Sequence, residues 1–290
     1  MPDRTTPGRL LARSSVSPVE AAATTDGGGR QIRWVILLPD RYDPAGRAPL
    51  VVAIHNFDGD AKGFAALIHA ERLRDRGMIV ALPQAGGRAP DWQGLGITLL
   101  APATGEDGAR VDDVLGVSEG IAILREAYGA GEVNLVGFSQ GATLALAVTR
   151  RLDAERVGAV RRLFMAAGSL AGTPDDTLAL AGTALTAYEP GHNLPQTVAD
   201  WRAGDPSERR FLPTLLKIKG CTLTDHDAGE RLDRTDYRCA DGTQVTHIFE
   251  ALGEHAWPGQ DEKYDSWLTG RGSISALDYT DLIARRIAGP

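Results

Sequence analysis

The chain has 290 residues, of which 43% are hydrophobic, so it is long enough to bury one large core. Its formal net charge of -7 gives no reason to expect nucleic acid or an anionic membrane as a partner. No apolar run approaches the roughly 20 residues of a membrane-spanning helix, so we expect a soluble protein. We expect it in the cytoplasm as the sequence stands, or secreted if a signal peptide was removed.

Residues 1–29 predict a flexible N-terminal tail. The segment is rich in Thr, Ser, Pro and Gly, and its short apolar patch covers only residues 10–12. It ends in three consecutive glycines at 27–29. Because no strand–loop–helix pattern surrounds these glycines, a flexible linker is favoured over a phosphate-binding loop.

From residue 30 onward, short apolar runs alternate with segments of helical length. The expected strands cover residues 32–38, 49–55, 78–82, 133–136, 160–167, 183–188 and 243–250. The expected helices cover residues 60–76, 111–128, 142–148, 195–219 and 275–288. Apolar strands separated by helices are typical of a mostly parallel central sheet with helices on both faces. We therefore expect residues 30–290 to form a single α/β domain.

A G-x-S-x-G pentapeptide at Gly137–Gly141 lies between an expected strand and an expected helix. A serine at such a sharp turn adopts a strained backbone, so only glycine fits two residues before and after it. The turn lifts the hydroxyl of Ser139 clear of the sheet, and the helix N-terminus behind it favours developing negative charge. This context predicts Ser139 as a nucleophile and the backbone N–H of Gln140 as an oxyanion donor.

A serine nucleophile needs a base and an orienting acid, because its hydroxyl is weakly nucleophilic at neutral pH. In folds with this type of turn, the acid and then the histidine follow the serine along the chain. His255 lies in a loop just after the last expected strand, which favours it over His247 inside that strand. His192 and His226 precede the strand and are disfavoured for that reason.

The acid is expected after the strand at 183–188, and Glu189 is the first carboxylate there. A glutamate is chemically adequate, because the acid has only to hold the imidazole tautomer and stabilise the imidazolium. Asp175 and Asp176, which follow the preceding expected strand, are the alternatives. The alternative interpretation is that Glu189 is a charged surface residue before Pro190 without a catalytic role.

Three aromatic residues complete the predicted surroundings of the serine. The loop after residues 49–55 makes the backbone N–H of Phe57 the expected second oxyanion donor. We expect Trp92 and Trp257 to line an aromatic acyl or alcohol site, with packing in the core as the alternative.

The sequence predicts no metal and no cofactor. Residues 58–60 lack the ligand spacing of a calcium loop, and the two aspartates at 112–113 suit a helix N-terminus. Cys221 and Cys239 are too few for a zinc site. Their spacing allows either a disulfide or two free thiols, and two cysteines alone do not decide between these.

The segment His255-Ala256-Trp257-Pro258-Gly259 resembles the H-T-W-P-G motif of the polyhydroxybutyrate depolymerase-like and feruloyl esterase group. Weaker similarities occur in the order typical of that group, at Leu82-Pro83-Gln84 with Trp92, at Val111-Asp112-Asp113-Val114, and at Cys221 with Cys239. The resemblance covers roughly residues 33–260, which is most of the chain.

This resemblance implies an α/β-hydrolase fold and a serine carboxylesterase that forms an acyl-enzyme on Ser139. It also implies His255 as the base and a disulfide between Cys221 and Cys239. The implied substrate is a short-chain, aromatic or carbohydrate-linked ester, either a small molecule or attached to a polysaccharide. The sequence does not indicate an oligomeric state.

The chain differs from this group at two positions. The group usually has His-Gly after the early strand, where this chain has His55-Asn56, which changes the oxyanion loop or the acyl pocket. It also usually carries an H-G-x-x-D element at the acid, and residues 188–193 lack that aspartate. The missing aspartate motivates one alternative, a homologue that binds esters or sugars without turnover. The other alternative is a serine peptidase with the same triad.

Overall fold

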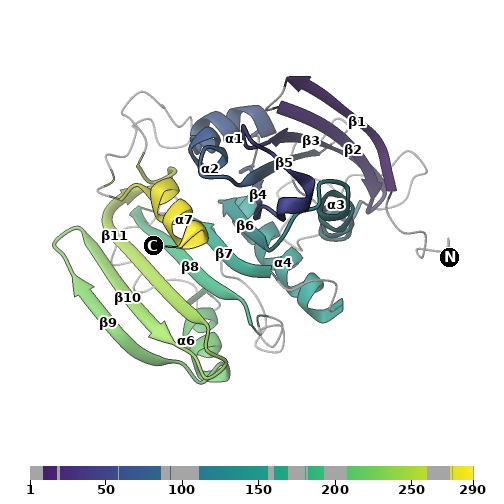
Figure 1. The fold of residues 1–290 in the computed structure, drawn as a ribbon. Coiled ribbons are helices and arrows are strands. Elements are labelled where there is room, and N and C mark those ends of the chain that lie inside the picture. Colours follow the sequence, from purple (N-terminus) through teal and green to yellow (C-terminus); the bar gives the residue numbers. More distant parts are fainter. Residues whose placement is uncertain are drawn as a thin grey trace.

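The computed structural model describes residues 9–17, 20–57, 59–85, 92, 111–155, 160–168, 180, 182–192, 208–259, 275 and 277–289. Its described strands form one sheet of 11 strands, in the order β1-β2-β3-β5-β4-β6-β7-β8-β11-β10-β9 (Figure 1). They are β1 (Arg9–Ser17), β2 (Glu20–Gly27), β3 (Arg30–Leu37), β4 (Leu50–Ile54), β5 (Ile79–Ala85), β6 (Val133–Phe138), β7 (Val160–Ala166), β8 (Ala184–His192), β9 (Thr222–Ala228), β10 (Leu232–Arg238) and β11 (Gln244–Glu254).

The middle of the sheet is parallel and both of its ends are antiparallel. Strands β5, β4, β6, β7, β8 and β11 pair in parallel. Strands β1 to β3 extend one end, and β10 with β9 extends the other, all with antiparallel neighbours. The carboxyl ends of the parallel strands therefore share one edge of the sheet, where ligands bind in open α/β sheets.

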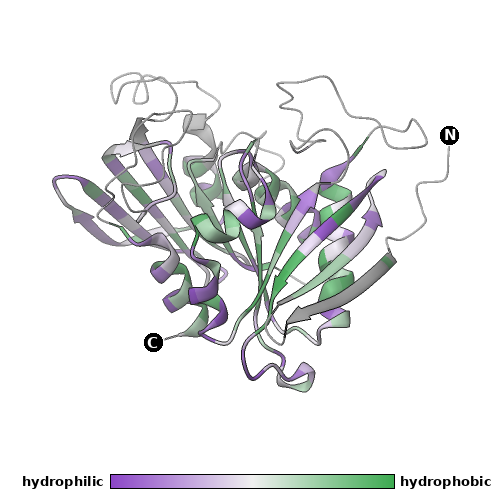
Figure 2. Cartoon of the chain, turned by 90° about the horizontal axis from the view of Figure 1, so that it is seen from above, coloured by the Kyte–Doolittle hydropathy of each residue, from purple (hydrophilic) through white to green (hydrophobic). Residues whose placement is uncertain are grey.

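Helices cover both faces of the sheet. One core contains side chains of α3 (Asp113–Ala127), α4 (Gln140–Glu155) and α6 (Glu208–Ile218). The other contains side chains of α1 (Ala61–Leu67), α2 (Ala70–Arg74) and α7 (Tyr279–Ala288). Every residue of β4 and β6 is buried, as expected for strands with helices on both sides, and Figure 2 shows hydrophobic residues along these central strands.

The predicted flexible tail is wrong for the strands β1 and β2, which pair with each other and with β3. The inward positions of β2 carry small residues, Ala21, Ala23 and Thr25, so the strand lacks the large apolar side chains that indicate burial. Thr25 accepts a hydrogen bond from the indole N–H of Trp34 (2.9 Å).

The glycine run forms a tight hairpin turn and is not a linker. Gly28 and Gly29 have φ values of 59° and 85°, which suits a two-residue hairpin turn. A Cβ at Gly28 would lie 1.8 Å from the Asp112 carbonyl oxygen, so the turn packs directly against the start of α3.

The polar segment between the two cysteines, where no strand was expected, also forms strands, β9 and β10. All seven residues of β9 are exposed, so the strand shows no alternation of apolar and polar side chains. Strand β10 buries the carboxylate of Asp236, which accepts hydrogen bonds from Thr246 and Gln244. A polar core of this kind is invisible to an analysis based on hydrophobic periodicity.

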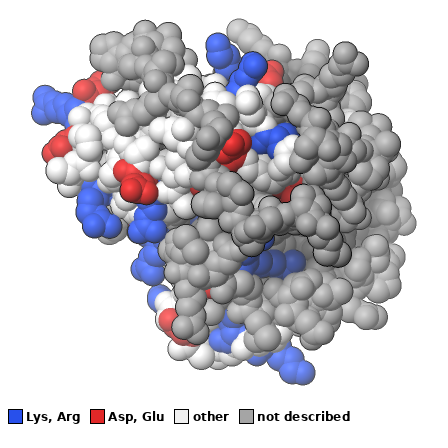
Figure 3. All heavy atoms as spheres, turned by 90° about the vertical axis from the view of Figure 1, so that its right-hand side faces the viewer, with Lys and Arg blue, Asp and Glu red and all other residues white. Residues whose placement is uncertain are grey.

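The charged surface is mixed on the side of the molecule that carries β1 to β3 and α3. Figure 3 shows described acidic and basic side chains interspersed there. Across the described ranges, no helix is both long and apolar enough to cross a membrane.

Candidate active site

Ser139 occupies the turn between β6 and α4 in a strained conformation, with a φ of 53°. Strain of this kind persists only where the surrounding structure fixes the backbone. The Ser139 N–H donates to the Ala166 carbonyl (2.9 Å), and the Ser139 carbonyl accepts from the N–H of Ala142 (3.0 Å). The turn is therefore held by β7 on one side and by the first turn of α4 on the other.

Close backbone packing explains both glycines of the pentapeptide. A Cβ at Gly137 would lie 2.4 Å from the Gly141 carbonyl oxygen. A Cβ at Gly141 would lie 2.2 Å from the carbonyl oxygen of Ile54, at the end of β4. Any larger residue would push α4 away from the sheet and displace the serine.

The imidazole of His255 faces this serine, with Nε2 2.9 Å from Ser139 Oγ. His255 is 4% exposed, and its ring centroid lies 5.3 Å from that of Phe138. Desolvation by burial lowers the pKa of His255 from 6.5 to about 4. The imidazole is therefore neutral at pH 7, which is the form able to accept a proton from the serine hydroxyl.

The end of β11 that leads to this histidine departs from regular strand pairing, because its register with β8 shifts after Glu250. Glu250 is fully buried and accepts hydrogen bonds from Tyr188 Oη (2.6 Å) and Ser275 Oγ (2.7 Å). A Cβ at Gly253 would lie 2.7 Å from Tyr188 Oη, so the irregular segment packs onto this pair. The cluster supports the turn that positions His255.

Sequence analysis did not identify Glu250. Its only signal is a carboxylate flanked by the apolar residues Phe249 and Ala251. Burial beside this carboxylate raises the pKa of Tyr188, so the phenol stays protonated and remains a donor.

Glu189 does not take the predicted position beside His255. Its Oε2 lies 2.8 Å from Nε2 of His247, and both side chains are largely buried. The parallel register places Glu189 opposite Phe249, next to His247 and away from the end of β11. The prediction of Glu189 as the acid is therefore wrong, because strand pairing assigns it a different histidine.

Two other candidate acids are not described, and two disfavoured histidines lie elsewhere in the fold. Asp175 and Asp176 lie outside the described residues. The imidazole of His226 pairs with Asp233 on the exposed β9–β10 hairpin (2.9 Å), and His192 ends β8.

The two expected oxyanion donors lie on segments that contact each other. Gln140 is the first residue of α4, and Phe57 belongs to the loop after β4. The close approach of Gly141 to the end of β4 brings these segments together. The side chain of Asn56 donates to the Phe57 carbonyl (3.0 Å), so the residue that replaces the usual glycine stabilises the loop.

Trp92 is 1% exposed and packs against the loop after β4, which carries the expected oxyanion donor Phe57. Its indole N–H donates to the His55 carbonyl (2.9 Å), and the two ring centroids are 4.6 Å apart. Its backbone N–H donates to Gln140 Oε1 (3.2 Å). Burial of His55 lowers the pKa of that imidazole.

Trp257 is likewise 1% exposed and packs under the histidine loop. Its ring forms edge-on contacts with Phe64, Phe138 and Tyr279, and its indole N–H donates to Thr280 (3.1 Å). The prediction that the two tryptophans line a substrate site is therefore corrected, because both are interior residues that pack against the segments carrying His55 and His255.

Cys221 and Cys239 form a disulfide that joins the start of β9 to the end of β10. Within the described ranges, no three His, Cys, Asp or Glu side chains lie close enough together to hold a metal ion.

No protein-family model matches the chain, and neither does any curated protein. Similar solved structures include a ferulic acid esterase, at 12% identity, a TM-score of 0.54 and coverage of 98% of this chain and 99% of that one. Thermogutta terrifontis esterase 2, phosphonylated by cyclosarin, is 12% identical with a TM-score of 0.51 over 88% and 87% of the two chains. An acetyl xylan esterase from Aspergillus awamori is 15% identical, with a TM-score of 0.47 over 75% and 87%.

The first two structures have TM-scores above 0.5 and therefore share the fold of this chain, and at 12% identity they show no more than that. Their similarity extends over most of each chain. Together with the parallel sheet, its two helix layers and the serine turn after β6, it shows that the chain has the α/β-hydrolase fold.

Proposed function

We propose that this chain is a serine carboxylesterase that works through an acyl-enzyme on Ser139. The observation that carries the proposal is the 2.9 Å contact between Ser139 Oγ and His255 Nε2 at a strained strand-to-helix turn. A nucleophile within hydrogen-bond distance of a neutral base is the arrangement that acyl transfer requires.

In the first half-reaction, Nε2 of His255 takes the proton of Ser139 as Oγ forms a bond to the ester carbonyl carbon. The backbone N–H groups of Gln140 and Phe57 stabilise the resulting oxyanion. The tetrahedral intermediate then collapses, the C–O bond to the alcohol breaks, and His255 returns the proton to the leaving alkoxide. Water repeats the sequence on the acyl-enzyme, releasing the carboxylic acid and restoring the serine.

We propose a short-chain, aromatic or carbohydrate-linked ester as the substrate. The histidine motif at residues 255–259 supports this class, as does the name of the solved ferulic acid esterase. The reaction as written requires no cofactor.

The test is hydrolysis of p-nitrophenyl acetate, p-nitrophenyl butyrate and methyl ferulate by the wild type beside Ser139→Ala and His255→Ala. Each variant is expected to lower kcat by at least about 10³-fold. His226→Ala is the matched control, because its imidazole also pairs with a side chain but lies on the exposed hairpin.

A folded wild type that hydrolyses none of these esters would overturn the proposal, as would activity that survives Ser139→Ala. Faster turnover of a peptide p-nitroanilide than of the esters would instead indicate a serine peptidase with the same nucleophile.

A further inference from the structure

A cavity of about 530 Å³ lies at the amino ends of β7, β8 and β11. Ser139 follows the carboxyl end of β6, so the cavity is at the opposite edge of the parallel sheet. The lining includes four arginines, one carboxylate and three uncharged polar side chains, namely Arg161, Arg162, Arg238, Arg286, Asp241, Thr186, Thr243 and Gln244. This space is called the arginine cavity below.

Strand register places two of the arginines at the ends of one row across the sheet. Arg162 on β7 pairs with Ala184 on β8, Gln244 on β11 continues the row, and Arg238 on β10 pairs with Gln244. Neighbouring strands are about 4.8 Å apart, so the Cα atoms of Arg162 and Arg238 are about 14 Å apart. Ala184 and Gln244 lie between them, and all four residues of the row line the cavity.

A third arginine reaches this space from α7. Arg286 Nη1 donates to Gln244 Oε1 (3.4 Å), and Nη2 lies 3.7 Å from Asp236 Oδ1. Desolvation by burial lowers the pKa of Arg286, although a guanidinium remains charged in a protein. An anion placed beside this partly desolvated cation would offset part of that cost.

The positive charge of the cavity exceeds the carboxylates that face it. Arg162 is compensated by Glu132, with Nη1 and Oε1 2.5 Å apart. Over the described part of the chain, Arg161 and Arg238 form no ion pair with a carboxylate. Two guanidinium groups on different strands are therefore available to an anion.

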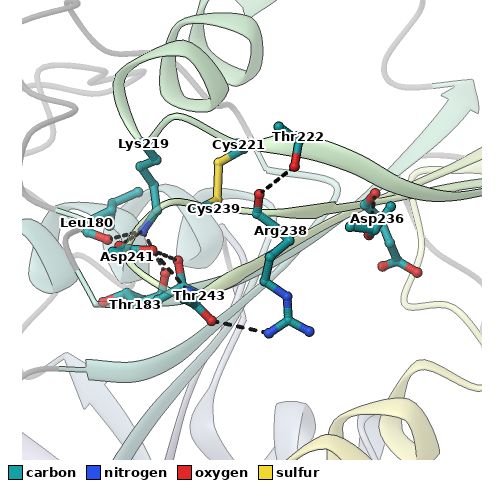
Figure 4. Close-up of a disulfide and its surroundings, with 12 residues drawn as sticks. Leu180, Thr183, Lys219, Cys221, Thr222, Asp236, Arg238, Cys239, Asp241 and Thr243 are labelled. Atoms are coloured by element: carbon teal, nitrogen blue, oxygen red, sulfur yellow. Dashed lines mark hydrogen bonds and ion pairs between the residues drawn. A yellow bond between two sulfur atoms is a disulfide. The ribbon is translucent and has the colours of Figure 1, made fainter.

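A disulfide braces the wall that carries one of these groups. Cys239 directly follows Arg238 and is bonded to Cys221 on the neighbouring strand (Figure 4). Asp241, in the next turn, is compensated by Lys219, with Oδ2 and Nζ 3.0 Å apart. The disulfide thus cross-links this wall, and the carboxylate of Asp241 is paired with Lys219 and not with Arg238.

We propose that the arginine cavity binds a small molecule through a phosphate or carboxylate group. The planar fork of a guanidinium matches both groups, and two or more such forks favour an oxyanion over a neutral ligand. The volume falls within the range of about 300–1,000 Å³ that holds small ligands, so a ligand the size of one sugar unit fits. The site is separate from the esterase centre and does not depend on it.

The test is isothermal titration calorimetry of the full chain with inorganic phosphate, glucose 6-phosphate and glucuronate, at about 20 mM salt to limit screening. At least one of these anions is expected to bind at a single site with a Kd below about 1 mM. Neutral glucose is expected not to bind. Comparison of glucose 6-phosphate with glucuronate distinguishes a phosphate ligand from a carboxylate ligand.

Arg238→Gln and Arg161→Gln alter exposed side chains, so both variants should remain folded. Each is expected to weaken binding at least about tenfold, through loss of a charge-assisted hydrogen bond. Arg33→Gln is the matched control, because this arginine is also exposed but lies on β3. Binding to Ser139→Ala is expected to equal that of the wild type.

Two results would overturn the proposal. One is the absence of saturable binding by all three anions. The other is a loss of binding in Arg33→Gln as large as in Arg238→Gln, because the attraction would then follow total charge and not this cavity.

Discussion

The two edges of the parallel sheet are built on different physical principles. At the carboxyl edge, close backbone contacts at Gly137 and Gly141 hold Ser139 beside the buried His255, and there is no space there for a larger side chain. At the amino edge, the arginine cavity depends on exposed charges carried by a braced but accessible wall. Added side-chain volume should therefore damage the first edge, whereas loss of an arginine charge should damage only the second.

Apart from the changes at Ser139 and His255, the largest effect is expected from Gly141→Ala, because the new Cβ would lie 2.2 Å from a backbone oxygen of β4. Moving α4 by even about 1 Å misaligns the nucleophile, so kcat/KM should fall at least about 10²-fold. Esterase assays with a thermal melt measure both losses. Gly46→Ala is the control, because its nearest neighbour is 3.7 Å away. Wild-type activity in Gly141→Ala would contradict the steric account.

The next effect concerns pH. His255 must be neutral to act as a base, so kcat/KM should fall as the pH drops through about 4 and not through 6.5. At pH 5 this difference corresponds to about 30-fold more active enzyme than a base with an ordinary pKa would provide. The measurement is a pH–rate profile of kcat/KM for the wild type and for Arg238→Gln, whose profiles should coincide.

Protonation of this histidine also affects stability. Its pKa is lower in the folded than in the unfolded chain, so the unfolded chain binds more protons and stability falls as the pH drops from 6.5 toward 4. Circular dichroism at each pH separates this loss of stability from the fall in kcat/KM at low pH. An acid limb near 6.5 in a folded protein would show that burial does not control the base.

A smaller effect should distinguish two carboxylates on neighbouring strands. Glu250→Gln removes a charge-assisted bond beneath the turn that positions His255, and kcat/KM should fall about tenfold. Glu189→Gln affects the separate pair with His247, so kcat/KM should stay within about twofold of wild type. Equal losses in the two variants would mean that the support of the histidine loop has been assigned to the wrong carboxylate.

The smallest effect on activity is expected from replacing both cysteines by serine. The cross-link spans 18 residues, so its loss should lower the free energy of unfolding by about 3 kcal/mol. Urea denaturation measures this change. Because the disulfide lies at the amino edge, kcat/KM should remain within about twofold of wild type, and a larger loss would show that the two edges are coupled.

The central strands were predictable because burial on both faces leaves continuous apolar runs such as β4 and β6. The positions of Ser139 and His255 were predictable for a different reason. A strained turn restricts its neighbours to glycine, and the order of catalytic residues along the chain follows the order of the strands.

The remaining features depend on contacts that leave little trace in the sequence. Strand β2 buries alanines and a threonine, and β9 buries nothing, so neither shows hydrophobic alternation. Glu189 lies where the sequence predicts the acid, just after the strand expected over residues 183–188. Its partner, however, is determined by the register between β8 and β11. A register is set by pairing across the sheet and not by local sequence.

The hairpin turn at Gly28 and Gly29 has a practical consequence for any shortened form of the protein. Removing residues before Arg30 would convert β3 from an interior strand into an open edge with unpaired backbone groups. The same cut would take away the hydroxyl that accepts the indole N–H of Trp34. We expect such a chain to keep Ser139 and His255 yet to self-associate, because strands β1 and β2, which lie in the predicted flexible tail, shield β3 from pairing with another chain.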